Sequence, residues 1–132
     1  MSTLSVTNIS DGTNSTATTN VVKGSAKAWV NFNGTGTPAI RQSYNVSSIT
    51  DNATGDFTVN FTNALTDTDY AVSVDCPEYN ATNNTVSARI RGSSTVGAPD
   101  TGTTTQLRVT WSGNTSPASR YDPNYFYVIV FR

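Results

Sequence analysis

The sequence predicts an all-β protein, and three observations support that prediction. Apolar residues recur with period two in several stretches, which is the period of a strand with one buried face. Thr, Ser and Asn make up roughly two fifths of the chain, whereas good helix formers are scarce. Turn residues separate the alternating stretches at intervals of roughly 10 to 20 residues. We therefore expect an antiparallel β-sandwich, jelly-roll-like, with about seven or eight strands and no convincing helix.

The clearest alternation lies between Ala26 and Thr62. Apolar residues take every second position from Ala28, and Gly34, Gly36 and Pro38 interrupt the pattern, so a first strand is expected to end near Asn33. A hairpin is expected next, with a loop of about four or five residues within 51–56 in which Gly55 supplies a positive φ.

The last stretch, 125–131, differs from the other expected strands at 70–76, 86–91 and 106–111 because it is apolar on both parities. A strand in a simple two-sheet sandwich has one inner face, so this one needs a second cover. The candidates are the N-terminal segment folded back and a neighbouring subunit. An uncovered apolar face would otherwise be an aggregation hazard.

The chain divides into a segment of residues 1–25 and a sandwich domain of residues 26–132. Residues 11–20 form a polar tract with almost nothing to bury, so the first segment is not expected to fold alone. It is interpreted as a disordered leader, an arm that pairs with a neighbouring chain, or an attachment segment.

Charge and composition argue against several classes of partner. The formal net charge is −1 and the basic residues are scattered, so no nucleic-acid partner is expected. No apolar run approaches the roughly 20 residues of a membrane span, and the first residues lack the features of a signal peptide, so no membrane insertion is expected. Cys76 is the single cysteine, which excludes an intrachain disulfide.

The residue types also disfavour catalysis. With no histidine and one cysteine, Ser-His-Asp, Cys-His and Cys/His zinc arrangements are impossible. Carboxylate pairs such as Asp51 with Asp56, Asp67 with Asp69, and Asp75 with Glu78 read more readily as turn residues than as a glycosidase pair. Asp11 and Asp51 lie in segments that do not follow a calcium-loop pattern. We expect no enzyme activity, no cofactor and no metal site.

One part of the chain resembles a known family. Three consecutive segments carry the resemblance, and they are KAWVNFNGTGT, AIRQSYNVSSITDNATGDFTVNFTNAL and DYAVSV. They resemble a module of tail fibres and other virion structural proteins of bacteriophages, especially marine and cyanobacterial ones. The resemblance covers residues 26–74, and RYDPNYFYVIVF is similar to the last strand of such modules. It implies a homotrimeric, all-β appendage protein without enzyme activity.

The resulting expectation is a non-enzymatic virion protein, made in the host cytoplasm and assembled on the phage particle. It would form a homotrimer, contact other virion proteins through its N-terminal segment, and bind a host-surface glycan or protein. A capsid or neck decoration protein (head fibre or cement) without receptor binding is the alternative, and a monomeric carbohydrate-binding module is a third interpretation.

Three groups of candidate residues follow. Loop tyrosines among short polar residues have the adaptable chemistry of a contact surface, which predicts receptor binding by Tyr79, Asn80, Asn83, Asn84 and Tyr121. The loops near 78–84, 92–103 and 112–124 are expected to face outward together, away from the particle. Large apolar residues that need a second cover predict a trimer interface of Trp29, Tyr125, Tyr127, Ile129 and Phe131. The apolar residues of the N-terminal segment predict virion attachment by Leu4, Val6 and Ile9.

Overall fold

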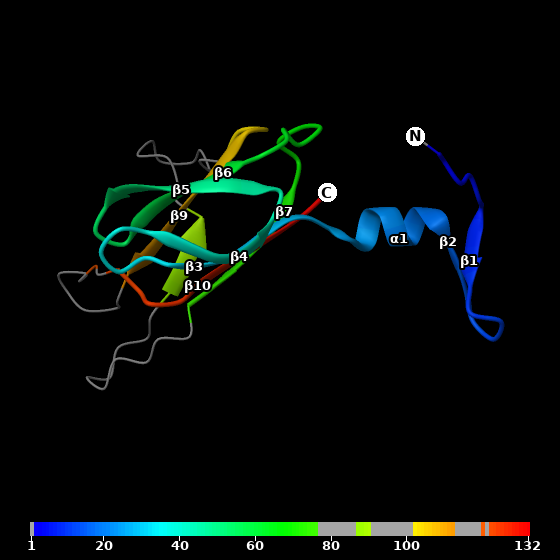
Figure 1. The fold of residues 1–132 in the computed structure, drawn as a ribbon, viewed down its shortest axis with the longest axis horizontal. Coiled ribbons are helices and arrows are strands. Elements are labelled where there is room, and N and C mark those ends of the chain that lie inside the picture. The colour runs from blue at the N-terminus through cyan, green and yellow to red at the C-terminus, as the bar shows by residue number, and fades with distance from the viewer. Residues whose placement is uncertain (1, 77–86, 91–101, 113–119, 121) are drawn as a thin grey trace.

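The computed structural model describes residues 2–76, 87–90, 102–112, 120 and 122–132, with the backbone alone for 87–90 and 112. Antiparallel strands dominate this part of the chain, which confirms the all-β prediction. Figure 1 labels the elements in chain order. They are β1 (Asn8–Ser10), β2 (Ser15–Ala17), α1 (Thr18–Gly24), β3 (Ala26–Asn33), β4 (Ala39–Tyr44), β5 (Val46–Ala53), β6 (Asp56–Phe61), β7 (Ala71–Asp75), β8 (Ser87–Ile90), β9 (Gln106–Ser112) and β10 (Phe126–Phe131).

Eight strands form two four-stranded antiparallel sheets, and β1 and β2 form a separate hairpin. The order is β4-β3-β10-β7 in the first sheet and β5-β6-β9-β8 in the second. The last strand, β10, therefore lies between β3 and β7 and pairs with both. A single residue, Asn45, connects β4 of the first sheet to β5 of the second, and its φ is 54°.

The two sheets share one hydrophobic core. Phe32 of β3, Phe57 of β6 and Phe126 at the start of β10 are fully buried, and the ring of Phe32 lies 5.3 Å from that of Phe57 and 5.2 Å from that of Phe126. Trp111 of β9 is also fully buried. Because every second residue of β3, β6, β9 and β10 points into this core, the period-two pattern of the sequence is explained.

Two details of the expected β5–β6 hairpin can be compared with the structure. Gly55 has a φ of 65°, which confirms the predicted positive value. The expected loop of four or five residues was wrong, because Ala53 pairs with Asp56 and only Thr54 and Gly55 lie between the strands. A register shift between Asp51 and Ala53 lets β5 continue through the polar residues that the sequence assigned to the loop.

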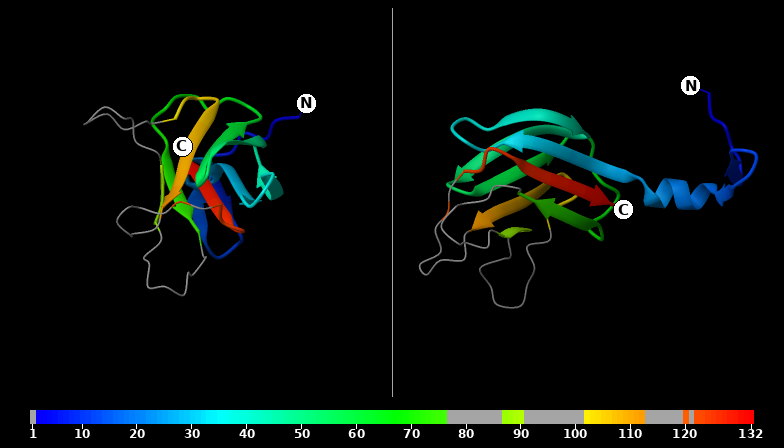
Figure 2. Two further views of the ribbon diagram at one scale, coloured as in Figure 1. Left: turned by 90° about the vertical axis from the view of Figure 1, so that its left-hand side faces the viewer. Right: turned by 90° about the horizontal axis from the view of Figure 1, so that it is seen from below.

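The N-terminal segment contains three elements that the sequence analysis did not predict, the strands β1 and β2 and the helix α1, and β4 replaces part of the loop expected after β3. The helix has seven residues, no side-chain cap and no buried residue, so neither apolar periodicity nor a capping pattern marks it in the sequence. Figure 1 and Figure 2 show α1 and the β1–β2 hairpin projecting from one end of the two sheets. We call residues 2–25 the arm, and this end of the sheets the arm end.

The strand directions give the molecule two distinct ends. Because β3 leaves the arm and runs away from it, the turns at 34–38 and 54–55 lie at the opposite end, which we call the far end (Figure 1). The end of β7, the start of β8, the end of β9 and the start of β10 also lie at the far end. The end of β8 and the start of β9 lie instead at the arm end. The expectation that the loop near 92–103 faces the same way as the other two was therefore wrong for the strand ends that bound it.

Backbone and side-chain bonds hold the far end together. Gly34 donates its N–H to the Pro123 carbonyl at 2.8 Å, and Gly55 donates to Asp122 Oδ1 at 2.8 Å. A Cβ on Gly34 would come within 2.8 Å of the Phe57 ring, so the position requires glycine. The chain that enters β10 is thus fixed to the turns that follow β3 and β5.

Candidate functional site

The outer face of the first sheet carries the candidate interface residues. Ile129 of β10 lies opposite Trp29 of β3, and Trp29 lies opposite Tyr44 of β4, so the three side chains form a row across the sheet. Tyr127 takes part in a second row, opposite Asn31 on one side and Asp75 on the other. The structure therefore brings Trp29, Tyr127, Ile129 and Phe131 together on one face, with Tyr125 immediately before them.

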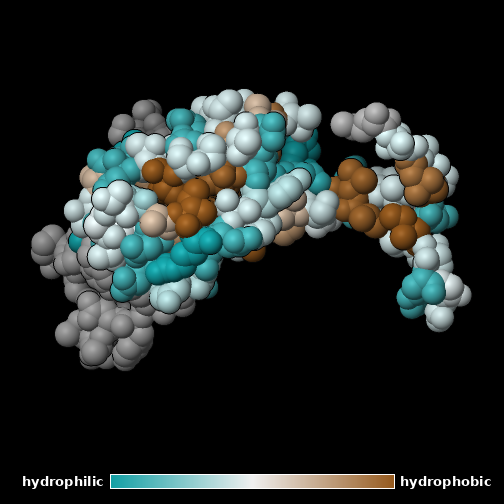
Figure 3. Space-filling view, viewed as in Figure 1, coloured by the Kyte–Doolittle hydropathy of each residue, from teal (hydrophilic) through white to brown (hydrophobic). Residues whose placement is uncertain are grey.

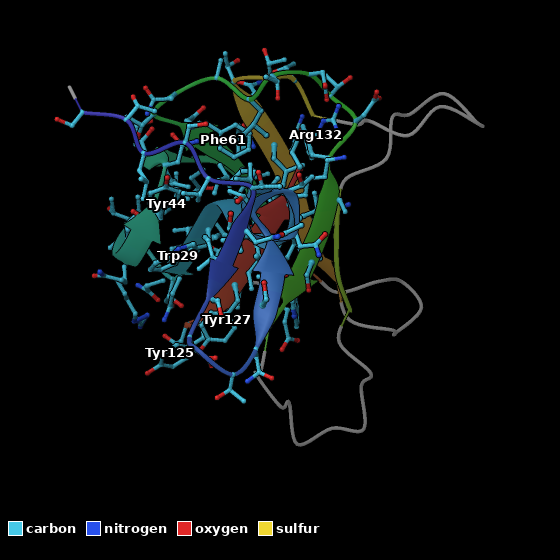
Figure 4. All side chains as sticks on the ribbon, turned by 90° about the vertical axis from the view of Figure 1, so that its right-hand side faces the viewer. Trp29, Tyr44, Phe61, Tyr125, Tyr127 and Arg132 are labelled. Atoms are coloured by element: carbon cyan, nitrogen blue, oxygen red, sulfur yellow. The ribbon has the colours of Figure 1, made fainter. Side chains whose placement is uncertain are left out.

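This face is incompletely covered by the described part of the chain. Tyr44 is 57% exposed, Tyr125 43%, and Ile129 and Phe131 each 38%, whereas the side chains that alternate with them on β10 are buried. Figure 4 shows Tyr44, Trp29, Tyr127 and Tyr125 along one side of the molecule. The geometry fits a protein contact, because large amphipathic aromatic side chains bring much apolar area at a low cost in side-chain entropy.

Arg41 adds a fixed positive charge at the β4 edge of this face. Its guanidinium lies 4.2 Å from the centre of the Tyr125 ring, and Nη1 donates to the Asn124 carbonyl at 2.9 Å. Tyr125 in turn lies 6.5 Å from Tyr127, ring centre to ring centre. The sequence analysis did not include Arg41 and Tyr44 among the interface candidates. Tyr44 could have been found, because neighbouring residues of a strand point to opposite faces and a large side chain next to Ser43 can lie on the outer face.

The described side chains on the outer face of the second sheet, from β5, β6 and β9, are mainly polar and bonded to one another. Asp56 is fully buried there and accepts two hydrogen bonds from Arg108, from Nε at 2.7 Å and from Nη2 at 3.0 Å. Arg120 also approaches the carboxylate, at 3.7 Å. Farther along β6, Asn60 donates to the hydroxyls of Ser48 and Thr50. These side chains are bonded to one another and so stabilise the domain.

Three of the carboxylates considered in the sequence have partners in the structure, and Glu78 lies outside the described residues. Asp56 is bound to Arg108, and Asp67 is bound to Arg132, whose Nε donates to Oδ1 at 2.6 Å. The Arg132 guanidinium lowers the pKa of Asp67 below its usual value, and Asp67 raises that of Arg132. At Asp11, the backbone N–H groups of Asn14 and Thr13 lower the pKa, which is the chemistry of a turn.

The receptor-binding candidates Tyr79, Asn80, Asn83, Asn84 and Tyr121 lie outside the described residues. The strand ends that bound their two segments are described, however. Asp75 at the end of β7, Ser87 at the start of β8, Ser112 at the end of β9 and Phe126 at the start of β10 all lie at the far end.

The attachment candidates lie in the arm and are exposed. Leu4 is 84% exposed, Val6 40% and Ile9, in β1, 47%. Val21 and Val22 of α1, which the sequence analysis did not single out, are exposed as well. Figure 3 shows the resulting apolar surface on the arm, apart from the apolar patch on the body of the molecule.

Two shallow hollows lie beside Asn45 at the arm end. One, of about 270 Å³, is lined by Tyr44, Asn45, Thr62 and Asn63, and the other, of about 240 Å³, by Lys27, Asn45, Ala64, Leu65, Thr66 and Arg132. Asn45 Nδ2 donates to the Lys27 and Asn63 carbonyls, so its amide is used to hold the link between the sheets. No group of three or more potential metal ligands occurs among the described residues. None of the described helical segments is long and apolar enough to span a membrane.

Comparison with known proteins adds no relative. No protein-family model matches the chain, and searches of curated proteins and of solved structures found no significant match.

Proposed function

We propose that the chain is a non-enzymatic structural protein of a bacteriophage particle, a homotrimeric tail-fibre or appendage module that contributes to attachment to the host surface. In this proposal the two sheets are the layers of a jelly-roll-like β-sandwich. The resemblance of residues 26–74 to phage tail-fibre modules motivates the assignment, and the proposed location is the virion.

The exposed face of the β4-β3-β10-β7 sheet is the observation that carries this proposal. Ile129 and Phe131 point outward from a central strand and remain 38% exposed, beside Trp29 and Tyr44. A contiguous apolar surface on a sheet is typical of a protein contact. Sister subunits would cover it, as the composition of 125–131 predicts.

The two ends of the molecule suit two different contacts, one with the virion and one with the host. The arm exposes Leu4, Val6 and Ile9 at one end, which suits docking to other virion proteins. The strand ends that bound 77–86 and 113–125 lie at the far end, which suits contact with a host glycan or protein. Three copies on one particle would also turn weak single contacts into useful avidity.

Light scattering coupled to size-exclusion chromatography tests the assembly. We expect a particle of three chains, each of 14.0 kDa, at micromolar concentration. A clean monomer under these conditions would overturn the homotrimer, and the uncovered face would then lack its proposed partner. A sugar titration of that monomer would test the carbohydrate-binding interpretation.

Binding to cells separates attachment from decoration. Fluorescently labelled protein is expected to adsorb to cells of the host bacterium and to compete with the phage for infection. A decoration protein would bind virions stripped of this chain and ignore the cells. Adsorption to stripped virions alone therefore contradicts the attachment role and supports the capsid or neck alternative.

A further inference from the structure

We propose that neighbouring copies are related by a rotation axis parallel to the strands, so that Arg41 of one copy pairs with Asp75 of the next. This inference rests on the proposed assembly and specifies its contact. The occupant of the exposed face is thus a second copy of this chain in parallel orientation.

The two charges lie at opposite edges of the same face. Arg41 belongs to β4 and Asp75 to β7, the two edge strands of the sheet. Gln42, next to Arg41, begins a cross-strand row that continues through Asn31 and Tyr127 and ends at Asp75. Three strand spacings of about 4.8 Å separate the edges, so Arg41 and Asp75 of one chain lie about 14 Å apart, too far to pair.

Both charges are presented without a counter-ion in the part of the chain that the structure describes. Arg41 contacts the Asn124 carbonyl and the Tyr125 ring, neither of which carries a charge. Asp75 Oδ1 accepts the Cys76 N–H at 2.8 Å, and no described cation bonds to this carboxylate. By contrast, Asp56 and Asp67 have arginine partners within the same chain.

The cross-strand row from Gln42 to Asp75 indicates which symmetry would bring Arg41 of one copy next to Asp75 of another. A rotation about an axis parallel to the strands keeps every residue at its own height, so residues of one row meet at the contact between copies. The β4 edge of one copy then faces the β7 edge of the next, which brings Arg41 to the level of Asp75. An antiparallel contact would instead place Arg41 at the level of the opposite end of the neighbouring sheet, where Phe131 pairs with Ala71.

The centre of the exposed face is apolar, which fits an interface with charged edges. Trp29 and Ile129 lie between the edge strands and supply the apolar part of the contact, with charges at the rim. Interfaces commonly combine an apolar centre with a polar rim that fixes the register. The same parallel arrangement places all arms at one end of the assembly.

A charge exchange tests the pairing. Arg41→Glu and Asp75→Arg each place like charges at the contact, and we expect each to weaken association by about tenfold per contact. The double variant restores opposite charges and is expected to return to the assembly of the original protein. Asp51→Arg, an exposed change on β5 of the other sheet, is the matched control and should leave association unchanged. Sedimentation equilibrium measures all four variants beside the original protein.

The outcomes separate this inference from the proposed function. A monomeric original protein would overturn the assembly itself. If the original protein assembles but the single variants associate normally, or if the double variant is not restored, the Arg41–Asp75 pairing is wrong and the trimer stands. Circular dichroism of each variant checks folding, and a misfolded single variant is replaced by Arg41→Gln or Asp75→Asn, each expected to weaken association less than charge reversal.

Discussion

The outer faces of the two sheets differ in how far their outward side chains are buried. On the β5-β6-β9-β8 sheet, outward residues such as Asp56, Thr58 and Thr110 are buried, and Asp56 is bonded to Arg108. On the β4-β3-β10-β7 sheet, Tyr44, Ile129 and Phe131 remain exposed. The described side chains of one face are largely bonded within the chain, whereas the other face leaves large apolar side chains exposed. Exposure of apolar residues, rather than hydrophobicity alone, is therefore what distinguishes the two faces.

The largest expected effect comes from the ion pair on the second sheet. Asp56→Ala removes two charge-assisted hydrogen bonds to Arg108, whose side chain is 36% exposed and regains water, so we expect a loss of about 3–4 kcal/mol. Urea unfolding followed by tryptophan fluorescence measures the free energy of unfolding. Asp51→Ala, at an exposed position on β5, is the control and should change it little. Equal, small changes in both variants would show that the ion pair is not structural.

The next effect should appear in assembly rather than in folding. Trp29→Ala removes an aromatic side chain from the open face and should cost about 2–4 kcal/mol of association free energy, in the range of an interface hot spot. Phe32→Ala, on the same strand but fully buried, should instead lower the free energy of unfolding by about 3–5 kcal/mol. Sedimentation and urea unfolding of both variants measure the split. A lower free energy of unfolding with an unchanged association constant in the Trp29 variant would contradict the proposed contact.

The link between the two sheets should respond more weakly. Asn45→Ala removes the amide that bonds to the Lys27 and Asn63 carbonyls and places alanine at a φ of 54°, so we expect a loss of about 2 kcal/mol. Asn45→Gly removes the same amide but tolerates the backbone angle, and should lose less. Thermal unfolding of the two variants gives the difference. A glycine variant less stable than the alanine variant would show that the backbone angle is unimportant.

The smallest effect concerns the exposed pair of Asp67 and Arg132. Because Arg132 lowers the pKa of Asp67, the pair contributes stability above the unfolded pKa of aspartate, near about 4, and loses it as the pH falls through the lower folded value. Asp67→Asn should remove this pH dependence, so that variant and original protein converge in acid. Thermal unfolding across pH measures it. The difference should also shrink in about 1 M salt, where the Debye length falls to about 3 Å.

The sequence predicts local features of this fold well and long-range ones poorly. The alternation in β3 and β10 identified which side chains share a face, because a strand has only two faces. Gly34 and Pro38 marked the end of β3. In contrast, Asp56 and Arg108 are 52 residues apart, and their pairing depends on β6 lying beside β9, which no local pattern encodes. The helix α1 was missed because its short sequence has neither an apolar stripe nor a cap.

The candidate site was predictable in part for the same reason. Trp29, Tyr127, Ile129 and Phe131 were singled out from composition and parity, and the structure places them on one face. Tyr44 joins them through the register of β3 with β4, and that register is shifted between Asn31 and Phe32. Arg41 lies within this irregularity, so a strict two-residue period does not show which way its side chain points.

The turn that carries Gly36 suggests a practical use for the molecule. Gly36 has a φ of 69° and no atom within 4 Å of a Cβ built on it, and the turn lies at the end opposite the arm. A foreign peptide inserted between Gly36 and Thr37 would be displayed in front of the scaffold, clear of the buried rings. Arms anchored to a bead or sensor surface would then orient every displayed peptide toward the solution.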